Sequence, residues 1–134
     1  MGATVIADSA QPGYEAHLVI DDDPATLWHT AWDPVAPLPH SLVIGLKNPQ
    51  EVFGLKYTPR ADMANGRIAD YEIYAGDDGH DWQRAAAGRW PNRAAAQTVR
   101  FEKPVAARYL KLVALTEVNG NGFTSAAEID VLLE

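Results

Sequence analysis

Apolar residues in this sequence alternate with polar or small residues over several short segments. The segments cover residues 42–46, 53–57, 71–75, 99–101, 110–112 and 129–133. A period of two puts alternate side chains on opposite faces of an extended chain, so the pattern predicts half-buried β-strands. No long amphipathic helix is visible, and only residues 14–27 could hold a helical turn. The chain is therefore predicted to be all-β, folded as a sandwich or a small barrel.

Turn residues and chain length indicate how the strands are connected. Asn48-Pro49 lies between the first two segments, and Asp78-Gly79 lies where a hairpin turn would follow residues 71–75. The 134 residues have a hydrophobic fraction of 47%, which is enough for one core. No internal repeat or linker divides the chain, so a single domain is expected.

Charge and cysteine content exclude several classes of function. The net charge is −7, from 18 acidic and 11 basic residues, which argues against nucleic acid and against an anionic membrane surface. No apolar run approaches the length of a membrane span. The absence of cysteine excludes disulfides, thiolate metal sites and thiol chemistry. The first residues show no signal-peptide pattern, so we expect either an intracellular protein or a piece of a longer secreted one.

Three loops are longer than a hairpin turn needs and carry polar groups beside aromatic ones. They span residues 28–40, 59–66 and 116–125. Loops of this kind on a rigid β scaffold usually carry the function. The candidate binding residues in them are His29, Trp32, Arg60, Asn65 and Phe123. Arginine guanidinium and asparagine amide groups can hydrogen-bond pairs of sugar hydroxyls, while an aromatic ring covers the C–H side of the sugar. Each of these residues alone could instead be solvated or packed in the core.

Acidic residues are concentrated in one turn. Residues 21–26 supply three carboxylates and a hydroxyl, and Glu128 lies just before the last strand. Calcium takes six to eight hard oxygen ligands, which such a turn can provide. The spacing is not that of a helix–loop–helix calcium loop, and a turn that caps a short helix is the alternative.

Catalytic motifs are not apparent. The serines have no nucleophile elbow, and the histidines have no metal-ligand spacing. Asp62 and Glu117 lie in the candidate loops, so a carboxylate pair for glycoside hydrolysis remains an alternative.

Several runs in order resemble the family 32 carbohydrate-binding modules, which belong to the discoidin-like coagulation factor 5/8 type C domains. The runs are IDDDPATLWHTAW, PLPHSLVIGL, GLKYTPR, NGRIADYEIYAGDDGHDW and ARYLKLVALTEVNGNGFTSAAEIDVL, from about Tyr14 onward. The resemblance implies an eight-stranded jelly-roll β-sandwich that binds sugars at its loop end. Family members are typically attached to secreted bacterial glycoside hydrolases and sialidases. Residues 1–134 are therefore expected to be one non-catalytic module excised from a larger secreted enzyme.

The resemblance also implies roles for the loop residues. His29, Arg60 and Asn65 would hydrogen-bond a galactose-type sugar, with Phe123 and Trp32 as apolar walls and Trp28 in the core. The sugar would be galactose, N-acetylgalactosamine or a lactosamine-type glycan, and the module would be monomeric, without nucleic acid or membrane partners. The alternative is a discoidin-type protein-interaction module without sugar specificity.

A structural calcium ion is implied as well. Its ligands would be the Leu18 carbonyl, the Asp21 side chain, the Asp23 carbonyl, the Thr26 hydroxyl and carbonyl, the Ala127 carbonyl and the Glu128 side chain. One position departs from the family pattern, because Asp22 stands where Gly is usual. Gly at such a position normally means a positive φ, which Asp tolerates better than most residues.

Overall fold

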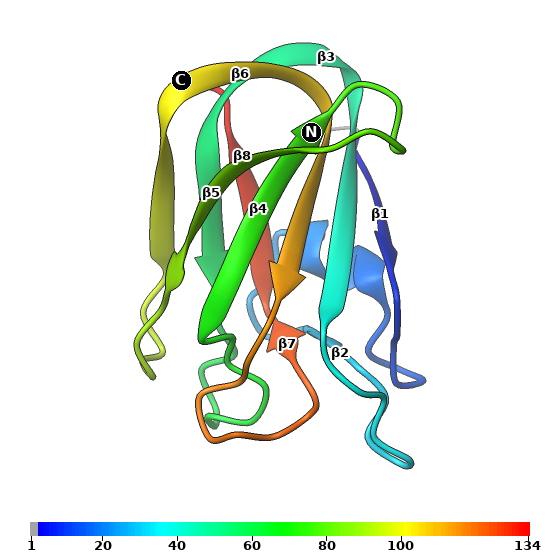
Figure 1. Ribbon diagram of the computed structural model, residues 1–134. Coiled ribbons are helices and arrows are strands. Elements are labelled where there is room, and N and C mark those ends of the chain that lie inside the picture. The colour runs from blue at the N-terminus through cyan, green and yellow to red at the C-terminus, as the bar shows by residue number, and fades with distance from the viewer. Residues whose placement is uncertain (1–2) are drawn as a thin grey trace.

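The computed structural model describes residues 3–134 and shows an antiparallel β-sandwich (Figure 1). The elements, in order, are β1 (Thr4–Ala7), the 3₁₀ helix η1 (Ala16–Ile20), β2 (Trp28–His29), β3 (His40–Thr58), β4 (Asp70–Gly76), β5 (Gln83–Arg89), β6 (Gln97–Ala114), β7 (Ser125–Ala126) and β8 (Glu128–Leu132). The jelly-roll sandwich prediction is confirmed. Within the described residues, no helix is long and apolar enough to cross a membrane.

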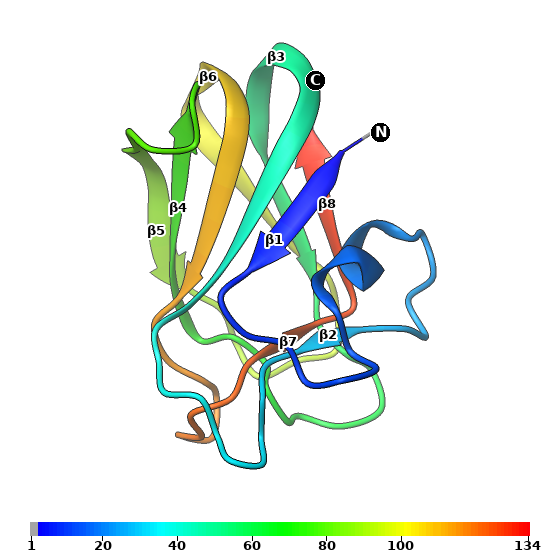
Figure 2. The same ribbon diagram turned by 90° about the vertical axis from the view of Figure 1, so that its right-hand side faces the viewer.

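Two long strands, β3 and β6, run through both layers of the sandwich. The first part of β3 pairs with β1 and with the last part of β6, and β4 and β5 extend this layer. Past a register shift between Gly45 and Gln50, the second part of β3 pairs with β8 and with the first part of β6. Both strands arch over one end of the molecule (Figure 2).

One prediction about connections was wrong. Segments 42–46 and 53–57 are not separate strands joined by a turn at Asn48-Pro49, because both lie in β3. Residues 99–101 and 110–112 likewise belong together in β6. Asn48-Pro49 lies in the exposed bend of β3, where a proline is tolerated because the ladder is already interrupted. The turn predicted at Asp78-Gly79 is confirmed between β4 and β5, with Gly79 at φ 79°.

The core lies between the two layers and is tied to the loops through an aromatic stack. Trp28 is 1% exposed, as predicted. Trp90 stacks between Tyr57 and Tyr71, at ring-centroid distances of 4.5 and 3.8 Å. The Tyr57 hydroxyl donates to the Ser125 carbonyl (2.9 Å) and accepts from the Ile68 amide (3.1 Å). The core thereby fixes where two of the long loops begin or end.

The long loops gather at one end of the sandwich. The β2–β3, β3–β4 and β6–β7 connections lie together at the lower end in Figure 1, and the β4–β5 hairpin lies at the upper end with the bends of β3 and β6. Figure 2 shows the same separation from the side. Residues distant in sequence therefore meet at the loop end.

Candidate functional site

A pocket of about 450 Å³ opens among the loops. It is lined by Tyr14, His29, Trp32, Arg60, Met63, Asn65 and Phe123. All five residues that the sequence predicted as sugar contacts are in this set, brought together from three loops. Tyr14 and Met63 were not predicted. Met63 lies in a loop already singled out, whereas Tyr14 lies before η1 and nothing in its spacing indicates the pocket.

His29 forms the buried floor of the pocket. It is 3% exposed, and its Nδ1 lies 2.7 Å from the Thr30 carbonyl oxygen. Since a carbonyl can only accept, Nδ1 carries the proton and Nε2 is left as an acceptor. Burial lowers the pKa of His29, and the Arg60 charge lowers it further against the hydrogen bond to Thr30. The ring is therefore neutral at pH 7.

Aromatic rings surround His29. Trp32 meets it nearly edge-on, with centroids 4.6 Å apart at 89°, and Phe123 lies 5.2 Å away at 40°. Tyr14 contacts Trp32 at 5.2 Å, and its carbonyl accepts the His29 amide (3.1 Å). Trp32 remains 40% exposed. An apolar ligand face therefore has rings to pack against on more than one side.

Arg60 is held in place before any ligand arrives. Its Nε and one terminal nitrogen donate to the two carboxylate oxygens of Asp62, both at 2.8 Å. Arg67 donates to the Arg60 carbonyl at 3.3 and 3.1 Å. The hydrogen bond from Arg60, against a smaller effect of burial, holds the pKa of Asp62 below its usual value. Three guanidinium N–H groups remain for other acceptors.

A buried carboxylate ties two of the loops together. Glu117 is 3% exposed and accepts from the amides of Gly66 (2.9 Å), Asn119 (2.6 Å) and Asn121 (3.1 Å), and from the Asn121 side chain (3.0 Å). Burial alone would raise the pKa of Glu117, but these hydrogen bonds outweigh it and hold the pKa below its usual value. Gly66 has φ 85°, and its carbonyl oxygen accepts a hydrogen bond from the Ser125 amide at 2.8 Å.

His40 joins the loop that carries Trp32 to the loop that carries Phe123. Its Nε2 lies 2.8 Å from the Gly122 carbonyl oxygen and 3.1 Å from that of Ala36, and its Nδ1 lies 2.8 Å from an Asp8 carboxylate oxygen. The carbonyls can only accept, so Nε2 donates. Gly122 precedes Phe123, and Ala36 lies in the loop that carries Trp32. The fully buried His40 ring therefore positions both walls.

The acidic turn packs against the start of β8. The side chain of Asp21 accepts from the Asp23 amide (2.9 Å) and from the Thr26 hydroxyl, and it contacts the Glu128 carboxyl group. Asp22 has φ 60°, the left-handed conformation expected at a position usually held by Gly. The turn predicted from the sequence is thus present.

Glu128 is the clearest sign that this cluster suits a cation. It is 7% exposed, and its Oε1 has no hydrogen-bond partner. Burial, the hydrogen bond with Asp21 and the nearby acidic charges raise the pKa of Glu128 to about 8. The hydrogen bonds from Thr26 and the Asp23 amide, against burial, hold the pKa of Asp21 below its usual value. Two carboxyl groups thus share one proton where a hard cation could replace it.

Among residues 3–134, no group of three or more His, Cys, Asp or Glu side chains has metal-binding geometry. The predicted ligand set contains only two carboxylates, and its other members are one hydroxyl and backbone carbonyls. Leu18 lies in η1, and Ala127 lies between β7 and β8, so both border the turn's contact with Glu128. The residues present therefore fit the predicted ion.

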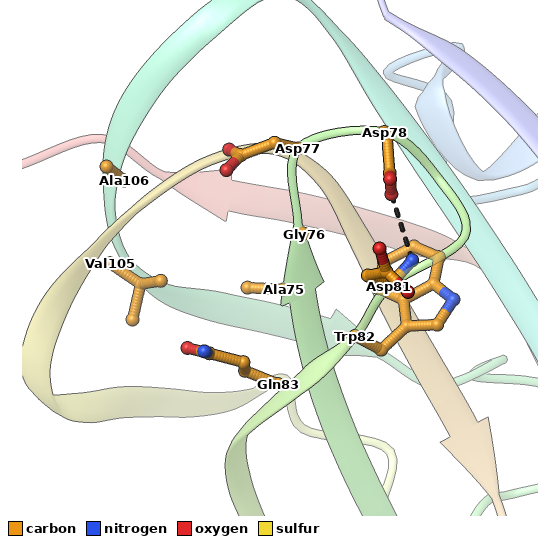
Figure 3. Close-up of a pocket in the computed structure, with 9 residues that line it drawn as sticks. All are labelled: Ala75, Gly76, Asp77, Asp78, Asp81, Trp82, Gln83, Val105 and Ala106. Carbon is orange, nitrogen blue, oxygen red and sulfur yellow. Dashed lines mark hydrogen bonds between the residues drawn. The ribbon is translucent and has the colours of Figure 1, made fainter.

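A second hollow, of about 420 Å³ (Figure 3), lies beside the β4–β5 hairpin, at the end of the sandwich opposite the long loops (Figure 1). It is lined by Ala75, Gly76, Asp77, Asp78, Asp81, Trp82, Gln83, Val105 and Ala106. None of the predicted site residues is among them. Asp78 accepts from the His80 and Asp81 amides of its own turn, at 2.8 and 2.9 Å. The hollow therefore lies between the β4–β5 hairpin and the bend of β6.

This chain combines a jelly-roll sandwich with a loop pocket that has aromatic walls and hydrogen-bonding side chains. These features place it in the class of sandwich domains that bind a ligand at their loop end. The family model of the F5/8 type C domain matches residues 4–129. The module CpGH89CBM32-5 of Clostridium perfringens, in complex with GalNAc-β-1,3-galactose, has a TM-score of 0.93 and 34% identity, covering 97% of this chain and 94% of that one. The chain thus belongs to the F5/8 type C domain family and, within it, to the family 32 carbohydrate-binding modules.

Two further relatives bear on the site and on the chain's context. The family 32 module of C. perfringens NanJ, in complex with galactose, has a TM-score of 0.90 and 35% identity, covering 96% of this chain and 92% of that one. A galactose oxidase of Gibberella zeae is 42% identical over an alignment 134 positions long that covers 95% of this chain. The chain spans only 19% of the length of that oxidase.

Proposed function

We propose that this chain is a non-catalytic module that binds terminal galactose-type sugars. The observation that carries the proposal is the convergence of His29, Arg60 and Asn65 with two aromatic walls in one pocket. Two similar solved modules contain galactose or a galactose disaccharide, which supports the same class of ligand here. Galactose, N-acetylgalactosamine and lactosamine-type glycans all belong to that class.

The pocket residues would hydrogen-bond the axial 4-hydroxyl and the equatorial 3-hydroxyl of galactose. The free Nε2 of His29 accepts a hydrogen bond from the 4-hydroxyl, while Arg60 donates hydrogen bonds to the oxygens of both hydroxyls. Asn65 completes the contacts to the 3-hydroxyl, and Phe123 and Trp32 cover the C–H face of the ring. Glucose carries an equatorial 4-hydroxyl and would leave buried donors and acceptors unpaired, which is where selectivity arises.

Such a shallow site would bind weakly, roughly from millimolar to tens of micromolar, or about −4 to −6 kcal/mol. Weak binding becomes useful when a module is tethered to an enzyme or repeated on one chain. The chain covers only a fifth of a related galactose oxidase, which supports a role as one part of a larger enzyme. We propose that this enzyme is a secreted bacterial glycoside hydrolase and that the module is monomeric in it.

The two carboxylates that could have formed a catalytic pair are both engaged. Asp62 is bound to Arg60, and Glu117 is buried under four donors that hold the loops. Neither group is free to transfer a proton to a sugar, which supports a module that binds its ligand without cleaving it.

The acidic turn would hold a structural Ca²⁺ ion. Asp21, Glu128 and the Thr26 hydroxyl would supply side-chain oxygens, and the carbonyls of Leu18, Asp23, Thr26 and Ala127 would complete the set. A bound ion supplies positive charge in place of the proton shared by the two carboxyl groups. The turn would then be fixed to β8 without touching the sugar pocket.

Titration with methyl galactoside, N-acetylgalactosamine, lactose and glucose, by calorimetry or NMR, tests the sugar proposal. We expect binding of the galacto sugars and not of glucose, and loss of binding in Arg60→Ala. Arg84→Ala is the matched control, because Arg84 lies on β5, pairs with Glu72 (3.2 Å) and is not among the residues that line the pocket. No binding to any galacto sugar at tens of millimolar would overturn the proposal. A partner protein captured equally well with and without galactose would instead favour the discoidin-type alternative.

A further inference from the structure

The ion pair between Arg60 and Asp62 leaves the two partners in different surroundings. The Arg60 side chain is 12% exposed and lines the pocket, whereas the Asp62 side chain is 57% exposed and is not part of the lining. Asp62 therefore holds Arg60 from outside the pocket. It takes Nε and one terminal nitrogen, which together form one of the edges a guanidinium can offer to a carboxylate.

Arg60 is also the one charged side chain among the described residues that line the pocket at pH 7. Tyr14, Trp32, Met63, Asn65 and Phe123 carry no charge, and His29 is neutral. The only positive charge at the site is thus balanced by the carboxylate bound to it. The buried Glu117 carboxylate, which acts on His29, adds further negative potential.

We propose that Asp62 makes the pocket prefer uncharged galacto sugars over sugars that carry a carboxylate, such as galacturonic acid. This rests on the proposed function of the same site. An unpaired arginine binds carboxylates through two parallel hydrogen bonds, and that combination favours uronates. With Asp62 in place, an anionic ligand meets an arginine whose charge is already neutralised, and the Glu117 carboxylate that acts on His29 adds to the repulsion.

The variant Asp62→Asn keeps the size of the side chain and removes its charge. A galacturonate would then meet an Arg60 side chain whose positive charge is no longer neutralised by a carboxylate. One unit charge at a few ångströms in a solvated site changes binding by about fivefold. We therefore expect the ratio of galacturonoside to galactoside affinity to rise about fivefold in the variant, and the rise to shrink at high salt.

The test compares three ligands: methyl galactoside, methyl galacturonoside and the methyl ester of that galacturonoside, which has the same size without the charge. Each is titrated by calorimetry or NMR into the wild type, Asp62→Asn and Asp77→Asn. Asp77→Asn makes the same change in net charge at the far end of the sandwich. Using affinity ratios removes any general weakening that follows if Arg60 becomes less well held.

In the wild type we expect the ester to bind better than the acid, and in Asp62→Asn we expect that preference to be lost or reversed. Asp77→Asn is expected to behave like the wild type. The proposal is overturned if the wild type binds acid and ester equally, or if Asp62→Asn weakens all three ligands by the same factor. Failure of the wild type to bind methyl galactoside would overturn the proposed function itself, and this inference with it.

Discussion

The loop-end pocket and the hairpin-end hollow have similar volumes, about 450 and about 420 Å³, and both combine aromatic with polar side chains. They differ in where those side chains come from. The hairpin-end hollow is built mainly from residues 75–83, which are neighbours in the sequence, together with the bend of β6 (Figure 3). The loop-end pocket takes its lining from residues as far apart as Tyr14 and Phe123.

The two regions also differ in what holds their polar groups. At the loop end, Glu117 and His40 are buried and bind the backbone of several loops. At the hairpin end, Asp77, Asp78 and Asp81 are exposed, and Asp78 serves its own turn. A pocket binds a ligand more tightly and more selectively when its donors and acceptors are held in place beforehand. Volume alone therefore does not identify a binding site, and the following variants test this difference.

The largest effect is expected from a methyl group added at Gly66. A Cβ there would lie 2.5 Å from the Ser125 hydroxyl and 2.8 Å from its amide nitrogen, on a backbone with φ 85°. Gly66→Ala should lower the free energy of unfolding by about 3 kcal/mol, from the strained backbone and the clash together, and should displace Asn65. Chemical denaturation and sugar titration measure the two effects.

Gly79→Ala is the matched control at the hairpin end. Gly79 has φ 79°, but a Cβ there would meet nothing within 4 Å. It should cost only about 1 kcal/mol, from the backbone alone, and leave sugar binding unchanged. Equal losses from the two substitutions would contradict the difference drawn between the ends.

Calcium removal should affect stability while sparing the pocket. Chelation should lower the free energy of unfolding by about 3 kcal/mol relative to calcium at a hundred times its dissociation constant. The metal-free protein should lose stability as the pH rises, because the pKa of Glu128 is raised from its usual 4.5 to about 8 on folding. That contribution is complete below pH 4.5 and is lost as the pH rises through about 8.

The benefit of calcium should therefore grow between pH 5 and pH 8, as measured by thermal unfolding with calcium and with a chelator. Glu128→Gln should abolish the difference between the two conditions. The affinity for methyl galactoside should change less than twofold on chelation. A large loss of sugar affinity would show that the acidic turn helps to hold the pocket residues in place, contrary to this prediction.

The buried carboxylate of Glu117 should matter more than the exposed one of Asp78. Glu117→Gln places an amide group against backbone donors and should cost about 2 kcal/mol. Because the pKa of Glu117 is lowered on folding, its contribution is present above its usual pKa of 4.5 and is lost as the pH falls through the lower folded value. The wild type and Glu117→Gln should therefore converge in stability in acid.

Asp78→Asn is the comparison for that variant, because the amide oxygen can still accept both turn amides. Its melting temperature should match the wild type at every pH from 4 to 8. A shift as large as that of Glu117→Gln would mean that the hairpin end is held as firmly as the loop end.

The alternation of apolar residues was sufficient to predict an all-β domain, either a sandwich or a small barrel, and the family resemblance was needed to choose the jelly-roll sandwich. The types of residue in the long loops were sufficient to predict five members of the pocket. The continuity of β3 and β6 could not be predicted, because it depends on pairing between distant segments. Tyr14 was missed for the same reason, since only its backbone pairing with His29 brings it to the pocket. Asp62 and Glu117 were candidates for catalysis because their partners cannot be read from spacing.

The smallest effect on sugar affinity should come from removing one aromatic ring at each end of the sandwich. Trp32 is 40% exposed at the pocket, and removing it in Trp32→Ala takes away one wall while His29 and Arg60 stay in place. The affinity for methyl galactoside should fall by about 1 kcal/mol, or about fivefold, with little change in stability. Trp82→Ala removes a ring of the same size at the hairpin end, where Lys111 lies 5.6 Å from its centroid. Titration should show the same affinity as the wild type. Because the two variants remove the same side chain, a difference between their affinities reports on its location alone, and equal affinities would remove the reason for placing the ligand at the loop end.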